Sequence, residues 1–229
     1  PIVQGPMGGV SGPELVAAVS NAGALGILPI WAESLSNAQK RIAQTQALTD
    51  RPFAVNLRAD LQQNDHIAAA TAMGVSLIHL FWGNPNSSMP AIRAGNARLI
   101  ATVGDARAAK EALDCGASAL IAQGFEAGGH VLGTTPLAQL LPEILDIAGE
   151  TPVIAAGGCA NAMDVAACMQ RGAQGVLLGT RFAVSKESEA HNEYKQALIT
   201  AGENSTAMSL CFDALWPDAP HRTLTNSTY

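Results

Sequence analysis

Short apolar runs alternate with stretches of helical periodicity along the whole chain. The runs are continuously apolar instead of alternating with polar residues, which is typical of parallel strands covered on both faces. The stretches between them carry apolar residues at helical spacing, as in Leu137, Leu140, Leu141, Ile144 and Leu145. We therefore expect eight strands, at residues 2–4, 24–28, 53–56, 77–81, 99–103, 120–123, 153–156 and 176–178.

Two of the helices have clear predicted ends. The first begins with Pro13, whose missing N–H costs nothing in a first turn, and it stops at Gly23. A later helix is expected to be capped by Asn161 together with Asp164, and to end before Gly172 in a left-handed conformation. The buried stripe expected on this later helix is Ala162, Val165, Ala166 and Met169.

Strand and helix repeated eight times predict a closed parallel (β/α)8 TIM barrel of the α/β class. The chain has 229 residues, of which 48% are hydrophobic, and this fits one barrel domain over 1–229 better than two domains. An open doubly wound sheet is the alternative topology. In a barrel, the active site lies at the carboxyl ends of the strands.

The composition argues against two classes of partner. A net charge of −6 and a pI near 5.3 would repel a phosphate backbone, and aromatic residues make up only 4% of the chain. No apolar stretch reaches the ~20 residues needed to span a bilayer. We therefore expect neither a nucleic acid nor a membrane as a partner.

The cysteines show neither Cys-x-x-Cys pairing nor clustering with histidines, which argues against a metal site and a disulfide framework. Reduced thiols and the lack of a signal peptide predict a cytoplasmic protein, although Pro1 is not an initiator methionine. The low charged fraction, 14%, suggests that some surface is buried in a homo-oligomer. The four cysteines are Cys115, Cys159, Cys168 and Cys211.

Polar residues and glycines follow the predicted strands. A glycine-rich turn after the sixth strand delivers His130 to the rim where ligands bind in such barrels. Glycines after the seventh and eighth strands match the usual phosphate site of barrels, where backbone N–H groups hold the anion. The residues concerned are Gly5 to Gly9, Asn56, Thr102, Gln123 to His130, Gly157, Gly158, Gly179 and Thr180.

These segments resemble the nitronate monooxygenase family, formerly called 2-nitropropane dioxygenases, which are FMN-dependent (β/α)8 barrels. The resemblance covers nearly the whole chain, and Glu126 to His130 is its most diagnostic part. Members usually run longer, and the chain is expected to continue beyond Tyr229. The segments are 4–8, 52–57, 123–130, 155–158 and 178–182.

The resemblance implies that His130 is the catalytic histidine. It also implies three groups of contacts with the flavin ring: Pro6, Met7 and Gly8 along the ring near N5, Asn56 and Gln123 at its polar edge, and Thr102 and Gly129 beside it. The phosphate of the cofactor would be bound by Gly157, Gly158, Gly179 and Thr180. Without a ligand, Asn56 and Gln123 could simply satisfy backbone groups at the barrel rim.

In this family a nitronate gives one electron to FMN, and oxygen completes the conversion to a carbonyl compound and nitrite. A histidine with its usual pKa of ~6.5 could take the α-proton of a nitroalkane, or it could donate a hydrogen bond to the nitronate oxygens. The sequence leaves both roles open for His130. Two alternatives remain: an NAD(P)H-dependent flavin reductase, similar to enoyl-acyl carrier protein or quinone reductases, and a barrel that only binds.

The remaining histidines are less informative. His79 points either into the barrel or onto the helices, and a hydrogen-bonded core histidine is the favoured interpretation. His66, His191 and His221 are expected on the surface. Glu126 is expected to be a structural hydrogen-bonding group.

Overall fold

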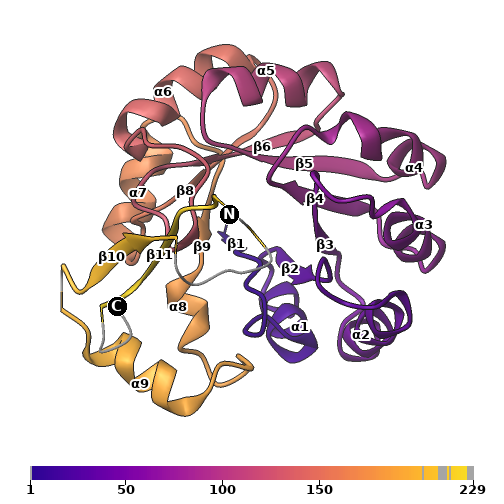
Figure 1. The fold of residues 1–229 in the computed structure, drawn as a ribbon, viewed down its shortest axis with the longest axis horizontal. Helices are drawn as coiled ribbons and strands as arrows, with labels where there is room; N and C mark the ends of the chain where they lie inside the picture. The colour runs from indigo at the N-terminus through magenta and orange to yellow at the C-terminus, as the bar shows by residue number, and fades with distance from the viewer. Residues whose placement is uncertain (1, 203, 211–215, 217, 226–229) are drawn as a thin grey trace.

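The computed structural model describes residues 2–202, 204–210, 216 and 218–225 of the chain, so Cys211 and the expected continuation past Tyr229 lie outside the described part. Eight parallel strands form one sheet, in the order β1-β9-β8-β6-β5-β4-β3-β2 (Figure 1). Their bounds are β1 Ile2–Gln4, β2 Gly26–Pro29, β3 Phe53–Arg58, β4 Leu77–Phe81, β5 Arg98–Val103, β6 Ala119–Gln123, β8 Val153–Ala156 and β9 Gly175–Leu178.

The two edge strands of this sheet, β1 and β2, meet and close the barrel. Gln4 N donates to Leu25 O at 2.9 Å, and Leu25 N donates to Ile2 O at 3.0 Å. The side-chain oxygen of Gln4 also accepts from Ile27 N at 3.0 Å. The predicted barrel is confirmed and the open doubly wound sheet is wrong, although β2 begins at Gly26 and Leu25 contributes a single bridge.

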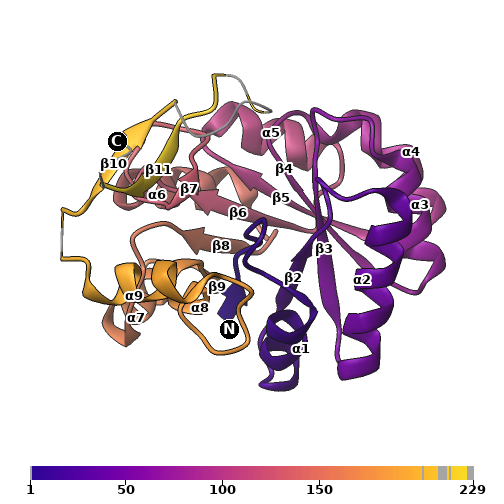
Figure 2. The same cartoon turned by 60° about the horizontal axis from the view of Figure 1, so that its bottom comes forward.

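Helices surround the strands on the outside of the barrel, as Figure 1 and Figure 2 show. Within the described ranges, no helix combines the length and the apolar character that crossing a membrane requires. The helix bounds are α1 Pro13–Asn21, α2 Leu35–Leu48, α3 Asn64–Ala72, the 3-10 turn η1 Pro85–Ser88, α4 Met89–Ala94, α5 Ala106–Asp114, α6 Leu137–Ala148, α7 Ala162–Gln170, α8 Thr180–Ala183 and α9 Asn192–Thr200.

The predicted helix ends are confirmed. The side chain of Asn161 accepts from the backbone N of Asp164 at 3.1 Å, and the carboxylate of Asp164 accepts in return from Asn161 N at 3.2 Å. This reciprocal capping box satisfies two donors of the first turn of α7. Gly23 and Gly172, which follow α1 and α7, have φ angles of +84° and +103°.

The two predicted helix stripes differ in outcome. On α6 the leucine-rich stripe is confirmed, since all its members are buried except the half-buried Leu145. On α7 the predicted stripe is wrong in part, because Cys168 is the buried residue while Ala162 and Ala166 are exposed. Ala162, Ala166 and Ala167 each offer little apolar area, so periodicity alone could not orient this helix.

The interior of the barrel changes from apolar to polar along the strands. Ala54, Ile100 and Ile121 belong to a buried apolar cluster inside the barrel. Because side chains two positions apart in a strand point to the same face, Asn56, Thr102 and Gln123 follow them on the inner face at the carboxyl end. His79 of β4 lies opposite Asn56 in the ladder, and both are buried. The polar layer therefore stands at the barrel mouth.

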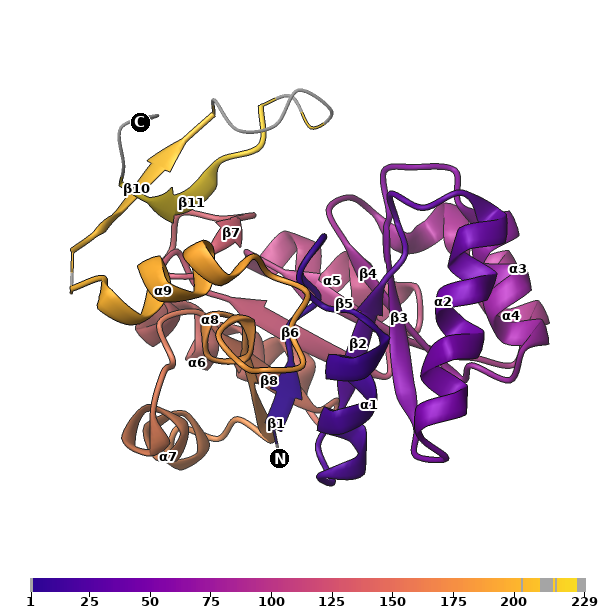
Figure 3. The same ribbon diagram turned by 90° about the horizontal axis from the view of Figure 1, so that it is seen from below.

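A second, smaller sheet lies beyond the carboxyl ends of the barrel strands (Figure 3). Its strands are β7 Gly129–His130, β10 Thr206–Ser209 and β11 His221–Leu224, in the order β10-β11-β7. The pairing is antiparallel and sets His221 opposite His130. The sequence patterns did not predict this sheet.

Candidate functional site

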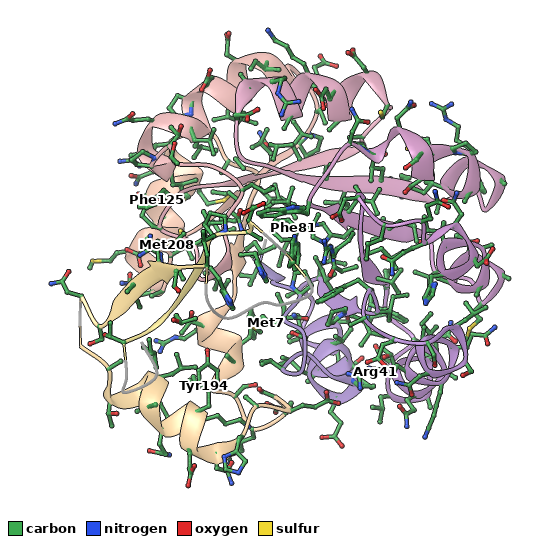
Figure 4. All side chains as sticks on the ribbon, viewed as in Figure 1. Met7, Arg41, Phe81, Phe125, Tyr194 and Met208 are labelled. Carbon is green, nitrogen blue, oxygen red and sulfur yellow. The ribbon has the colours of Figure 1, made fainter. Side chains whose placement is uncertain are left out.

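The loops that carry the predicted cofactor residues meet at one end of the barrel. A Cβ added to Gly179 would lie 3.8 Å from Met7 Sδ, and one added to Gly128 would lie 3.7 Å from Thr180 Oγ1. The loops after β1, β6 and β9 are therefore in contact. Figure 4 labels Met7 and Phe81 near the barrel axis.

The glycine pair after β8 forms a tight cradle. Gly157 and Gly158 have φ angles of +108° and +69°, and a Cβ on Gly157 would lie 3.0 Å from both Ala127 N and Gly124 O. Within the described part of the chain, the backbone N–H groups of Gly157, Gly158, Gly179 and Thr180 make no hydrogen bond. Four unfilled donors on two adjacent loops suit an anion such as a phosphate group.

The loop after β1 is held by its own hydrogen bonds. Met7 N donates to Ser11 Oγ at 3.1 Å, and Met7 O accepts from Ser11 N at 2.8 Å. Gly8 N, by contrast, has no partner among the described residues. Of the three predicted flavin neighbours, Gly8 therefore has the backbone donor that remains available to a ligand, since Pro6 has none.

His79 points into the barrel and bonds to both predicted cofactor residues beside it. Asn56 Nδ2 lies 3.0 Å from His79 Nδ1, and His79 Nε2 lies 2.7 Å from Thr102 Oγ1. Burial lowers the pKa of His79 to about 3, because the protonated ring would lose its hydration. The favoured interpretation of a hydrogen-bonded core histidine is confirmed.

Gln123 and Glu126 brace the loop that ends in His130. Gln123 Nε2 donates to His130 O at 3.0 Å, and its Oε1 accepts from Leu132 N at 2.9 Å. A bond from Gln123 to a flavin ring stays a prediction and would use its second amide hydrogen. Glu126 Oε2 accepts from Leu137 N at 2.9 Å, at the start of α6, which confirms its structural role.

The imidazole of His130 lies within a stack of rings. Its centroid is 3.8 Å from that of Trp216, with 29° between the planes, and 4.5 Å from that of His221, with 14° between them. Trp82 meets His130 edge-on at 6.0 Å. His221, expected on the surface, is half-buried, because the pairing of β11 with β7 brings it to the barrel mouth. His191 is exposed as expected, whereas His66 is half-buried.

Sequence reasoning missed the aromatic and cationic side chains of the mouth. The side chain of Arg58 is 5% exposed, bonds to Asp60 through two of its nitrogens, and places its guanidinium 3.7 Å from the centroid of Trp216. Trp31 and Trp82 come just after the carboxyl ends of β2 and β4. This position was the signal in the sequence that could have placed them at the barrel mouth. Trp82 has φ +63°, which is uncommon for a bulky residue and often marks a functional site.

Together these features can hold a flat ring that carries an anionic tail. The glycine loops after β8 and β9 supply donors for the anion, and the polar layer on β3 to β6 supplies donors and acceptors for a ring edge. Across the described chain, no three His, Cys, Asp or Glu side chains gather closely enough to hold a metal ion. The described cysteines are free thiols.

Comparison with known proteins supports this interpretation. The model of the nitronate monooxygenase family matches residues 1–77 and 64–228. A nitronate monooxygenase of Pseudomonas aeruginosa is 32% identical over 263 residues, which cover 92% of this chain and 73% of that protein. The (3aS,4S,5R,7aS)-5-hydroxy-7a-methyl-1-oxo-octahydro-1H-indene-4-carboxyl-CoA dehydrogenase of Rhodococcus jostii is 37% identical over 98% of this chain, and the chain spans 62% of its length.

Two solved structures are also similar. FabK from Thermotoga maritima superposes with a TM-score of 0.90 at 32% identity, covering 98% of this chain and 70% of its own. A nitroalkane oxidase from Streptomyces ansochromogenes superposes with a TM-score of 0.87 at 28% identity, covering 98% and 76%. The barrel found here is thus shared with several oxidoreductases.

Proposed function

Because the chain belongs to the nitronate monooxygenase family of oxidoreductases, we propose that it binds FMN at the barrel mouth and oxidises alkyl nitronates or nitroalkanes with oxygen. The supporting observation is that four backbone donors after β8 and β9, which make no hydrogen bond to any described residue, occur together with a polar layer on β3 to β6. Bound FMN would supply the electron acceptor. The products would be a carbonyl compound and nitrite.

The residues of this chain would position the reactants and move the proton. Gly157, Gly158, Gly179 and Thr180 would hold the phosphate through their backbone N–H groups. His130 would stand at the substrate and either take the α-proton of a nitroalkane or donate a hydrogen bond to the nitronate oxygens. The rings around His130 would exclude water from the reacting carbon.

The His130→Asn variant separates these two roles. If His130 is the base, the variant keeps FMN but turnover of the neutral nitroalkane falls at least about 100-fold, while turnover of preformed nitronate falls less than about tenfold. Equal losses with both substrates would remove the base role. His191→Asn is the matched control, because asparagine can also cap α9, where His191 accepts from Glu193 N.

Dehydrogenation of a CoA thioester is a second candidate function. The CoA dehydrogenase of Rhodococcus jostii shares more identity with this chain than the Pseudomonas aeruginosa nitronate monooxygenase does, 37% against 32%. Both substrate types have an acidic C–H beside an electron-withdrawing group, so the same base could serve either.

Anaerobic mixing with each electron donor distinguishes the candidates. Bleaching of the flavin absorbance by a nitronate alone supports the proposed function, and bleaching by a saturated acyl-CoA supports the dehydrogenase. Bleaching by NADH would favour the flavin reductase instead. A purified protein that stays colourless after addition of FMN would contradict all three and favour a barrel that only binds.

A further inference from the structure

A chain of hydrogen bonds crosses three adjacent strands at the polar layer of the barrel. Asn56 on β3 lies opposite His79 on β4 in the ladder, and their side chains meet at 3.0 Å. On the other side, His79 reaches Thr102 of β5 at 2.7 Å. His79 is only 1% exposed, and both of its ring nitrogens are thus bonded to residues that are predicted to contact the cofactor.

The direction of each bond in this chain can be assigned. Asn56 also contacts Leu57 O at 3.2 Å, and because a carbonyl oxygen only accepts, the amide nitrogen Nδ2 must be the group on that side. Nδ2 therefore donates to Nδ1 of His79. The imidazole is neutral, since burial keeps its pKa near 3, so its hydrogen is on Nε2 and is donated to Thr102 Oγ1.

This assignment leaves one acceptor and one donor for a ligand. The amide oxygen of Asn56 has no partner among the described residues, and the hydroxyl hydrogen of Thr102 is not needed for its bond to His79. The polar edge of a flavin ring carries an imide N–H between two carbonyl oxygens. An acceptor beside a donor is the complement of that edge.

We propose that His79 is a positioning residue, which turns the amide oxygen of Asn56 and the hydroxyl hydrogen of Thr102 toward the polar edge of the flavin ring. The inference rests on the proposed function, because it assumes that a flavin occupies the barrel mouth. His79 itself does not touch the cofactor in this arrangement. It acts by fixing which atoms its two neighbours present.

Gln4 shows what a buried polar side chain does when its role is only structural. Its side-chain oxygen accepts from the backbone of Ile27, and its amide nitrogen bonds to Ser11 Oγ at 2.8 Å within the loop after β1. Those bonds close the barrel and shape a turn. His79, in contrast, bonds to two side chains, and each of these keeps a polar atom for a further partner.

The test measures flavin affinity by the quenching of FMN fluorescence, without turnover. In His79→Leu, Asn56 and Thr102 lose their common partner, and we expect the Kd for FMN to rise about tenfold, as the loss of a neutral hydrogen bond implies. Ile100→Val is the matched control. Ile100 pairs with His79 in the ladder and is buried in the barrel, so its truncation lowers the melting temperature without changing the Kd.

A double-mutant cycle with Thr102→Val sharpens the result. Alone, Thr102→Val removes the hydroxyl group and should also raise the Kd about tenfold. In the His79→Leu background it should add less than about twofold, because the hydroxyl is no longer held in place. Additive effects, or a Kd unchanged in His79→Leu while the protein stays folded by circular dichroism, would overturn the inference.

A second readout needs no variant and no flavin. Nitrogen-15 NMR of the imidazole in the unaltered protein should show His79 neutral at pH 7 with its hydrogen on Nε2. A hydrogen on Nδ1 would overturn the inference even if His79→Leu fails to fold. If the unaltered protein does not bind FMN at all, the proposed function fails, and the NMR result still decides whether His79 orders its neighbours.

Discussion

The two sides of the barrel mouth are built from different atoms. On β3 to β6, the side chains of Asn56, His79, Thr102 and Gln123 present polar groups, and we call this the side-chain sector. The glycine loops after β8 and β9 present backbone N–H groups, and we call these two loops the backbone sector. A side chain can be truncated with a local effect, whereas a backbone donor depends on the conformation of its whole loop. The two sectors should therefore respond differently to substitution.

The largest effect is expected in the backbone sector, for Gly157→Ala. The added Cβ would lie 3.0 Å from Ala127 N and Gly124 O, and the φ of +108° is strained for any side chain. We expect a loss of roughly 2–4 kcal/mol in the free energy of unfolding and a rise of at least about 100-fold in the Kd for FMN. Urea unfolding and flavin titration measure the two quantities.

Gly116→Ala separates backbone strain from the clash. Gly116 has φ +92°, but a Cβ there meets no atom within 4 Å. This variant should lose only about 1 kcal/mol of stability, and its affinity for FMN should be unchanged. An FMN affinity in Gly157→Ala equal to that of Gly116→Ala would contradict the role assigned to the backbone sector.

The next largest effect is expected in the side-chain sector, where His79 should make the stability of the protein depend on pH. The pKa of His79 is about 3 in the folded chain and near 6.5 when unfolded, so at intermediate pH the unfolded chain binds a proton that the folded chain does not. The contribution of His79 to the free energy of unfolding is therefore fully present above pH 6.5 and is lost as the pH falls toward 3. The slope should approach about 1.4 kcal/mol per pH unit.

Other groups also titrate in this range, so the measured quantity is the difference in unfolding free energy between the unaltered protein and His79→Leu. That difference should shrink as the pH is lowered from 6.5. Asn56 and Thr102 carry no charge, so no ion pair at His79 would mask the effect. A difference independent of pH would show that His79 is accessible to protons in the folded state.

The contrast between the sectors also explains what the sequence could predict. Apolar runs mark the strands and glycines mark the tight turns after them, so the positions of Gly157, Asn56 and Thr102 at the barrel mouth follow from local patterns. The inward direction of the His79 side chain does not follow from such patterns, because the alternation of side chains along β4 is compatible with either face. It was decided by hydrogen-bond partners on the neighbouring strands.

The aromatic stack around His130 could not be predicted for a different reason. His221 reaches the mouth because β11 pairs with β7, two segments that are far apart in the sequence. Neither segment has the length or the alternation of a typical strand. Arg58 is the last residue of β3, and only the fold shows that Trp216 lies against its guanidinium.

The smallest effect is expected at Arg222 on β11. Its side chain contacts the loop that follows β6, which lies between the two sectors. Arg222 Nε donates to Ala127 O at 3.1 Å and another guanidinium nitrogen donates to Phe125 O at 2.9 Å, while the group lies 4.9 Å from the Phe125 ring centroid. The same loop carries His130 and packs against Gly157. Arg222→Gln should therefore lower the free energy of unfolding by about 1–2 kcal/mol and speed amide hydrogen exchange at His130 and Val131.

Arg107→Gln is the control for this substitution, because Arg107 pairs with Glu111 in the open on α5 and its loss should cost at most about 0.5 kcal/mol. Faster exchange confined to β7 and its loop, with a weakened affinity for FMN, would mean that the backbone sector depends on support from β11. If exchange quickens while the affinity stays the same, the glycine loops hold their shape without Arg222. The two sectors are then independent, and the small sheet serves only to place His130.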